Sequence, residues 1–210
     1  MRLLCLATFA LVMLAAAPAS ASSALELVRI AKAHELAHEE DIALRRYMEA
    51  LSLDPTCDEA YLGLGALRAR RGDLREADRV YSVALEHVPQ LAAARTARAY
   101  VRRALGQRSE AVDDLLHAAG PSEDPKVLRV LATWYGEDGQ TPAQLAVWRR
   151  IATRAEATDD VVLAHEAKTM VRALVILVGP ADPATFPADD RNPVRRTIAA
   201  TASPKPRPSR

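Results

Sequence analysis

The sequence has 210 residues, of which 28 are Lys or Arg and 27 are Asp or Glu, so its formal net charge is only +1. This balance excludes a strongly basic or strongly acidic protein, and an aromatic content of 4% leaves little material for β-strands. Abundant alanine and leucine instead favour closely packed helices.

Residues 1–21 have the pattern of a secretory signal peptide. One basic residue, Arg2, precedes an apolar run over 3–17, and the small residues at 19–21 form a cleavage site. Cleavage before Ser22 would give an exported protein, periplasmic or secreted. An uncleaved N-terminal anchor is the alternative.

The chain has two cysteines, Cys5 and Cys57. Signal cleavage would remove Cys5 and leave Cys57 as the one cysteine, so no internal disulfide could form. A single thiol in an exported protein is either buried or available for an intermolecular bridge. We expect burial in a helix junction.

Residues 22–57 and 58–91 are each predicted to form two helices joined by a turn. The helices are expected near 24–37, 41–53, 58–71 and 74–87. Residues recur at a spacing of 34 in the sets Ala43, Ala77 and Ala111; Ala50, Ala84 and Ala118; Tyr47, Tyr81 and Leu115; Gly72 and Gly106; and Pro55 and Pro89. Helical amphipathicity has a period of about 3.6 residues and fixes no such spacing, so the chain contains internal repeats.

Residues 58–91 resemble one tetratricopeptide repeat (TPR), in which a large residue and Leu-Gly precede a turn Gly, and Ala, an aromatic residue, Ala and Pro follow. The matching residues are Tyr61, Leu64, Gly65, Gly72, Ala77, Tyr81, Ala84 and Pro89. Two antiparallel helices would approach closely at Gly65, with Gly72 at positive φ in the turn and Asp73 capping the second helix. The resemblance implies an all-α fold, a right-handed α-solenoid of about four helix-turn-helix repeats plus a C-terminal capping helix.

Residues 92–124 are predicted as the third repeat. Its helices are expected near 91–105 and 109–118, with a packed stripe of Ala94, Ala97, Val101 and Leu105 on the first. This stripe leaves Arg95, Arg98 and Arg102 as a basic ridge along the helix. We expect the ridge to be a solvated face; the alternative is a ridge that meets acidic groups of a partner.

Residues 125–157 are predicted as a fourth, degenerate repeat. Its helices are expected near 126–135 and 142–155. Gly139 stands at the turn between them, but Gln144 replaces the alanine that the pattern requires.

Two further segments follow the repeats. Residues 158–179 are predicted as a capping helix near 159–178, since a repeat array needs such a helix to cover its last open face. Residues 180–210 contain seven prolines and no sustained apolar periodicity, which indicates a disordered, Pro-rich basic tail. Contact of this tail with anionic surfaces is one option, and a purely solubilising role is the other.

His34-Glu35-Leu36-Ala37-His38 matches the HExxH pattern of zinc peptidases, in which two histidines on one helix face bind Zn²⁺ and the glutamate acts as general base. Glu59 could be imagined as a third ligand. A small zinc-binding or metallopeptidase-like protein is therefore the alternative to a binding scaffold. The repeat pattern argues against it, because the first helix ends near Ala37 and His38 stands where later repeats have a turn glycine.

The resemblance to TPR proteins also implies a partner-binding groove on the first helix of each repeat. The positions that packing leaves free there are Leu25, Val28, Lys32, Glu35, Glu59, Leu62, Ala66, Arg70, Thr96, Tyr100 and Arg103. They would form an apolar floor flanked by basic residues, which suits an extended or helical segment with apolar anchors and acidic flanks. The asparagines with which peptide-clamping TPR domains hold a C-terminal carboxylate are missing from this set.

The sequence contains no Gly-rich phosphate loop, no CxxC pair and no Ser nucleophile motif. We therefore expect no enzymatic activity, no cofactor and no bound metal. The expected partner is another protein or a peptide segment in a cell-envelope or extracytoplasmic assembly. Nucleic acid is not expected, because export would separate the protein from it, and no transmembrane span is expected after signal cleavage.

Overall fold

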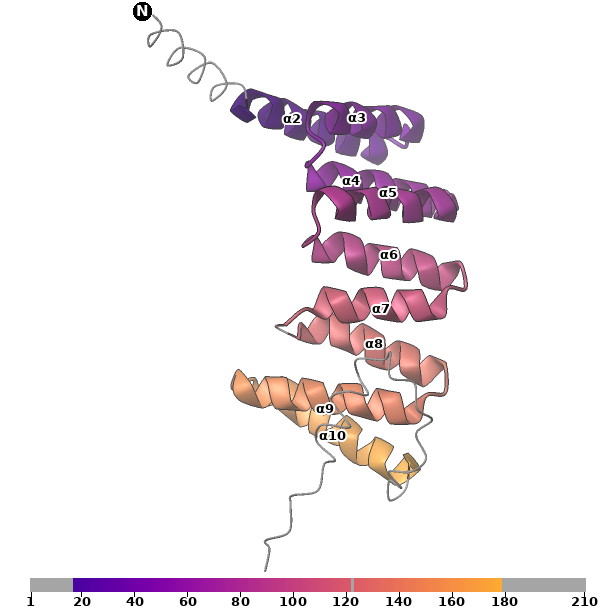
Figure 1. The fold of residues 1–210 in the computed structure, drawn as a ribbon, viewed down its shortest axis with the longest axis vertical. Helices are drawn as coiled ribbons and strands as arrows, with labels where there is room; N and C mark the ends of the chain where they lie inside the picture. The colour runs from indigo at the N-terminus through magenta and orange to yellow at the C-terminus, as the bar shows by residue number, and fades with distance from the viewer. Residues whose placement is uncertain (1–16, 122, 179–210) are drawn as a thin grey trace, which may run out of the picture. The chain divides into compact units, whose positions relative to one another are not determined.

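The computed structural model describes residues 17–121 and 123–178, which form helices joined by short turns (Figure 1). No strand occurs within these ranges, and the predicted all-α fold class is confirmed. The predicted apolar signal run and the tail over 180–210 fall largely or wholly outside the described residues. None of the helices in the described ranges is both long enough and apolar enough to cross a bilayer.

The helices, in chain order, are α2 (Ala17–Leu36), α3 (Glu40–Leu53), α4 (Asp58–Arg70), α5 (Leu74–His87), α6 (Ala92–Ala104), α7 (Arg108–Ala119), α8 (Pro125–Glu137), α9 (Thr141–Ala157) and α10 (Val161–Val178). They divide into two compact units, and the boundary falls after Ala118, at the end of α7. The first unit contains α2 to α7 and the second contains α8 to α10.

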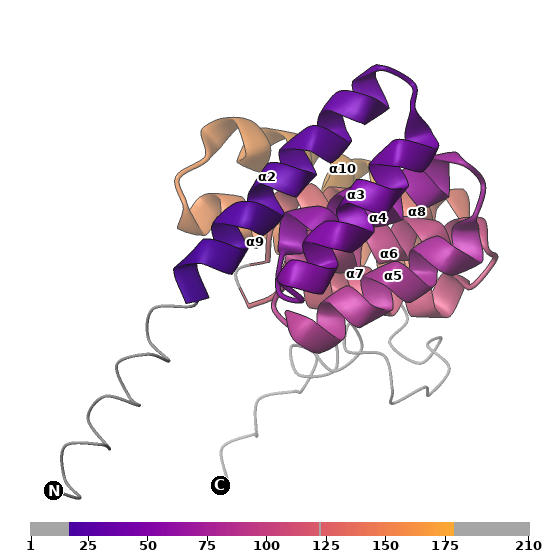
Figure 2. The same ribbon diagram turned by 90° about the horizontal axis from the view of Figure 1, so that it is seen from above.

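In the first unit, helices are stacked in the order of the sequence. α3 packs on α2 and α4, and α5 packs on α4 and α6. The turns lie at alternating ends of the helices, so neighbours are antiparallel (Figure 1), and Figure 2 shows α2 and α3 side by side. Because α4 also contacts α2 and α6, the first helices of the three pairs lie in one row.

Most helices begin and end within two residues of their predicted bounds, and α2 is the exception. Its predicted start was residue 24, whereas the helix already includes Ala17. Residues 19–24 contain only alanine and serine, which offer no break, and Pro18 lies in the first turn, where proline is tolerated. The predicted start was therefore too late.

Glycines let the helices of the first unit approach closely. A Cβ added at Gly65 would lie 2.5 Å from Cε1 of Tyr81, and one added at Gly63 would lie 2.3 Å from Cζ of Tyr47. Both tyrosine rings are buried, so they fill the space that the missing side chains leave. The close approach predicted at Gly65 is confirmed.

Cys57 is buried in the same unit, as expected, and burial raises the pKa of its thiol.

The turns between paired helices share one backbone conformation. A residue at positive φ follows the first helix in each pair: His38 (60°), Gly72 (83°), Gly106 (82°) and Gly139 (68°). The N–H of Gly72 donates to Ala69 O (3.0 Å), and the next N–H, of Asp73, donates to Arg68 O (3.0 Å). His38 and Glu39 repeat this pattern, in which two otherwise unpaired helix carbonyls gain donors.

Asp73 does not cap α5 as predicted. It occupies the N-cap position, but its side chain makes no hydrogen bond to the helix. Its Oδ2 instead accepts from Nη1 of Arg68, 3.2 Å away, because a charged donor competes with the neutral backbone N–H groups.

In the second unit, α9 packs on both α8 and α10. Gln144 is accommodated because Gly136 faces it from α8: a Cβ at Gly136 would lie 2.6 Å from Nε2 of Gln144.

Two helices of the second unit have N-caps in which a side chain accepts a backbone hydrogen bond. Asp124 accepts from Lys126 N (2.9 Å) at α8, and Asp160 accepts from Leu163 N (3.0 Å) at α10.

Replacement of His38 by Gly should stabilise the fold by up to about 1 kcal/mol, because only glycine adopts a positive φ without strain from Cβ. Denaturant unfolding of the His38→Gly protein measures the change in the free energy of unfolding. His38→Ala is the matched control, since it removes the imidazole and keeps the Cβ. A lower stability of His38→Gly, together with loss of stoichiometric zinc, would contradict the turn interpretation.

Candidate partner-binding face

The predicted groove residues lie on the row of first helices in the first unit. We call the exposed side of α2, α4 and α6 the first-helix face. Leu25, Lys32 and Glu35 lie on α2, and Glu59, Leu62, Ala66 and Arg70 lie on α4. Thr96, Tyr100 and Arg103 lie on α6. The contacts of α4 with both neighbouring helices bring these three sets together.

Apolar side chains are accessible on this face. Leu25 is 48% exposed and Tyr100 is 49% exposed, and Leu62 and Ala66 are half-buried. Lys32, Glu59 and Arg70 are exposed around them, and Thr96 and Arg103 are half-buried. The face therefore combines apolar area with charges of both signs.

Val28 does not belong to this face. Its side chain is only 3% exposed and packs in the same core cluster as Ala24, Ala31 and Tyr47. The sequence pattern predicted that Val28 faces the groove. In the structure, the Val28 side chain instead packs against residues of α3 and α4. The prediction for Val28 is wrong.

A polar cluster joins α2, α3 and α4 at one end of the face. The carboxylate of Glu35 accepts hydrogen bonds from the Tyr47 hydroxyl and from Nη2 of Arg70. Burial and the Glu35 carboxylate raise the pKa of Tyr47. The Glu35 side chain is 19% exposed, whereas Arg70 is 55% exposed, so part of the Arg70 guanidinium is open to a partner.

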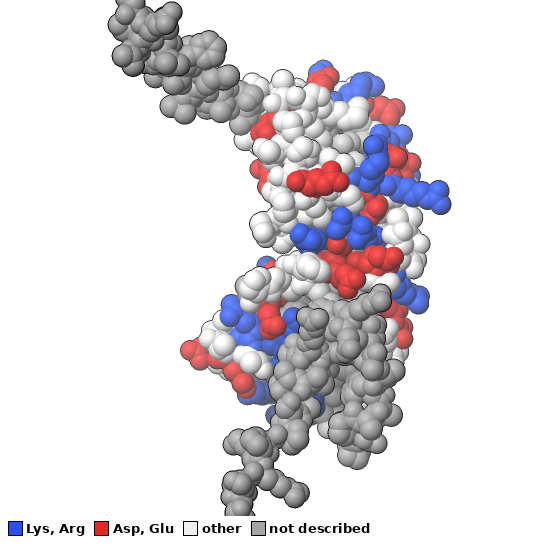
Figure 3. All heavy atoms as spheres, in the orientation of Figure 1, with Lys and Arg blue, Asp and Glu red and all other residues white. Residues whose placement is uncertain are grey.

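Acidic side chains also lie on the face, near the start of α4. The pKa of Glu59 is raised, mainly because of a hydrogen bond with the neighbouring Asp58 carboxyl, while the charge of Lys32 acts in the opposite direction across the helices. Figure 3 shows basic and acidic side chains interspersed on the side of the first unit that faces the viewer.

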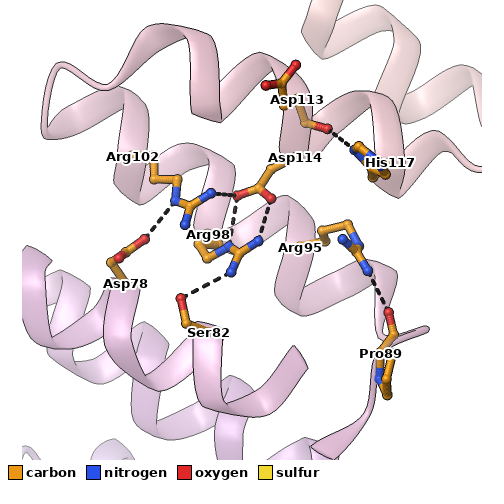
Figure 4. Close-up of polar contacts among 9 residues, drawn as sticks. All are labelled: Asp78, Ser82, Pro89, Arg95, Arg98, Arg102, Asp113, Asp114 and His117. Carbon is orange, nitrogen blue, oxygen red and sulfur yellow. Dashed lines mark hydrogen bonds and ion pairs between the residues drawn. The ribbon is translucent and has the colours of Figure 1, made fainter. Parts of the chain in front are cut away.

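Two arginines of the α6 ridge, Arg98 and Arg102, point toward Asp114 and into the protein (Figure 4), whereas the hydrogen bond of Arg95 lies at the surface. Nε and Nη2 of Arg98 donate to the two carboxylate oxygens of Asp114 on α7, at 2.9 and 2.6 Å. Arg102 donates to Asp114 (3.0 Å) and to Asp78 on α5 (2.9 Å). Arg95 donates to the carbonyl of Pro89 (2.6 Å).

For Arg98 and Arg102 both predictions are therefore wrong. Arg98 and Arg102 are only 14% and 21% exposed, which excludes a solvated face, and their acidic partners belong to this chain. Asp114 is 4% exposed and shared by the two guanidinium groups. The cluster connects α5, α6 and α7, and a bidentate arginine pair fixes their mutual orientation.

Replacement of Asp114 by Ala should lower the free energy of unfolding by about 3 kcal/mol or more, because two largely buried cations would lose their shared anion. Equilibrium denaturation measures this loss. Glu76→Ala is the control, since it removes an exposed carboxylate that pairs with Arg79 on the surface (2.7 Å) and should change stability far less. Equal losses in the two proteins would show that the Asp114 cluster is not structural.

The HExxH segment does not form the histidine pair of a zinc peptidase. α2 ends at Leu36, and His38 lies beyond it at positive φ, so the two histidines are not successive positions on one helix face. Nδ1 of His34 lies 2.5 Å from the carboxylate of Glu39, and Glu35 is engaged by Tyr47 and Arg70. Within the described residues, no group of three or more His, Cys, Asp or Glu side chains is placed to hold a metal.

No protein-family model matches the sequence, and no curated protein gives a significant sequence match. Solved structures of TPR proteins do match. YrrB, a TPR protein with an unusual peptide-binding site, superposes with a TM-score of 0.51 at 17% identity, over 72% of this chain and 86% of YrrB. A TPR protein from Parabacteroides merdae superposes with a TM-score of 0.58 at 18% identity, over 73% of this chain and 60% of that one.

These likenesses, together with the recurrent turns and helix pairs, define the class of protein. The chain has the TPR fold, as the spacing of 34 residues predicted. At 17% and 18% identity these likenesses define the fold and not the function.

Proposed function

We propose that this protein is a non-catalytic binding scaffold that holds a segment of another protein on its first-helix face. The observation that carries the proposal is the accessible apolar area of that face, where Leu25 and Tyr100 are each about half exposed. Apolar side chains in such positions anchor partner segments, and the surrounding charges select among them. YrrB, which shares the fold, has a peptide-binding site.

The charges of the face favour a segment with apolar anchors and acidic flanks. Arg70 keeps more than half of its side chain exposed even while it pairs with Glu35, and Lys32 is exposed one helix away. Arginine can bind a second carboxylate with the donors that its first partner leaves free. Glu59 marks the acidic edge of the face and would disfavour a segment that is acidic throughout.

A photo-crosslinking residue at Leu25 should capture one defined partner in the protein's own cells, whereas the same residue at Met48 should not. Met48 is a matched control, because it is 47% exposed but lies on α3, outside the face. Mass spectrometry of the crosslinked product gives the partner and the attached segment. Capture of the same partner from both positions would contradict binding at the first-helix face.

Charge reversal tests the electrostatic part of the same proposal. Arg70→Glu together with Arg103→Glu should reduce the Leu25 crosslink several-fold, since acidic flanks would then be repelled. Arg45→Glu with Arg75→Glu is the control, because these exposed arginines lie on α3 and α5. Circular dichroism verifies that each protein is folded, and equal losses would mean that overall charge, not the face, governs binding.

We further propose that the protein acts outside the cytoplasm, in a cell-envelope or extracytoplasmic assembly. The support is the sequence pattern over 1–21, with its apolar run and small-residue cleavage site. Ala24, Val28 and Ala31 pack into the core and would all remain after cleavage before Ser22, so removal of the signal is compatible with the packing of α2.

The protein isolated from its cells should begin at Ser22. Intact-mass measurement decides between cleavage and retention, because the two products differ by the mass of 21 residues. Replacement of the small residues Ala19 and Ala21 by larger ones should block processing and leave the uncut form. A native protein that still carries Arg2 would contradict the cleavage proposal.

A further inference from the structure

A groove lies between α9 and α10 in the second unit. Arg149, Ala152 and Glu156 line it from α9, and Lys168, Val171 and Arg172 line it from α10. We call it the α9–α10 groove. It belongs to helices that contribute nothing to the first-helix face, so it extends the proposed function to a second site.

The charges are distributed unevenly along this groove. Near the turn that joins the helices, Nζ of Lys168 pairs with the carboxylate of Glu156 at 2.7 Å. Arg149 lies about two turns before Glu156 and Arg172 about one turn after Lys168. Because α9 and α10 run in opposite directions from their turn, both arginines lie toward the other end of the groove.

No side chain of the described residues engages these two arginines. Both side chains are exposed, and neither guanidinium makes a hydrogen bond or ion pair within residues 17–121 and 123–178. Most other arginines of those ranges pair with a carboxylate, as Arg129 does with Glu166 and Arg150 with Glu123 in this same unit. Two cations at one end of a groove repel each other unless an anion lies between them.

The middle of the groove is apolar. Ala152 and Val171 are half-buried there, between the charged pair and the two arginines. The aliphatic stems of Arg149 and Arg172 extend this apolar strip toward their charged ends. Figure 3 shows basic and acidic side chains together over the visible part of the second unit.

We propose that the α9–α10 groove binds an acidic segment of a partner protein, with an apolar side chain over Ala152 and Val171 and a carboxylate between Arg149 and Arg172. The planar guanidinium groups match the two oxygens of a carboxylate and can each donate twice. A basic segment would place its charge against the two arginines and is excluded by the same argument.

Fluorescein-labelled, terminally blocked peptides test the proposal on the full chain. Each contains one Leu or Phe followed by two Asp residues in a Gly-Ser background, and the matched peptides carry Asn instead of Asp. Fluorescence anisotropy should show saturable binding of the acidic peptides and at least about tenfold weaker binding of the Asn peptides. Absence of saturable binding, or equal binding of the two sets, overturns the proposal.

Protein variants locate the binding. With the first-helix face disabled by Arg70→Glu and Arg103→Glu, Arg149→Gln with Arg172→Gln should weaken binding of the acidic peptides by about tenfold. In the same background Arg45→Gln with Arg75→Gln, which removes the same charge from the first unit, should leave binding unchanged. Equal weakening by both pairs overturns the assignment. Arg149→Gln with Arg172→Gln alone should leave the Leu25 crosslink intact. The two experiments therefore distinguish failure of the α9–α10 groove proposal from failure of the first-helix face proposal.

Two other occupants of the α9–α10 groove, a small anion and the chain's own C-terminal segment, would give different results in the peptide assay. Full displacement of the peptides by inorganic phosphate, with no dependence on Leu or Phe, would make the groove a small-anion site and overturn the proposal. Asp189→Asn with Asp190→Asn removes acids from this chain's own C-terminal segment. Tighter peptide binding by that variant would assign the groove to the chain's own tail rather than to a partner.

Discussion

The paired helices depend on a residue in the left-handed region at the end of the first helix. Gly72, Gly106 and Gly139 supply it in three pairs, and His38 supplies it in the first. The two hydrogen bonds that close each turn satisfy carbonyls of the outgoing helix and reverse the chain within three residues. The second helix can then return along the first, and small residues such as Gly65 set how closely the two approach.

The same constraint explains how much of the fold could be predicted from the sequence. Turn glycines and buried alanines have few alternatives, so their spacing of 34 residues marks the helix pairs. Residue type alone was a less reliable guide to helix caps and helix ends. Asp73 has the residue type and the position of an N-cap, yet its carboxylate accepts a hydrogen bond from Arg68 instead of from the helix backbone. The start of α2 was missed because nothing in the alanine-rich stretch after Pro18 signals where the helix begins.

The arginines of α6 show why the site was harder to predict than the fold. The spacing of Arg98 and Arg102 places both on one side of their helix, but the residue that decides their role, Asp114, lies on the next helix. Spacing within one helix cannot reveal that the charges are neutralised across three helices. Val28 is a similar case, since the same register position is half-buried at Leu62 on α4 and fully buried on α2.

Pairing therefore distinguishes arginines that hold the protein together from those that can serve a partner. The guanidinium groups of Arg98 and Arg102 are paired with the carboxylates of Asp114 and Asp78. A partner protein could bind these guanidinium groups only by breaking a largely buried network. Arg70 is intermediate, since Glu35 fixes its direction while more than half of it stays exposed. A guanidinium held in this way has already lost part of its rotamer entropy, so it binds a second carboxylate at a smaller entropic cost.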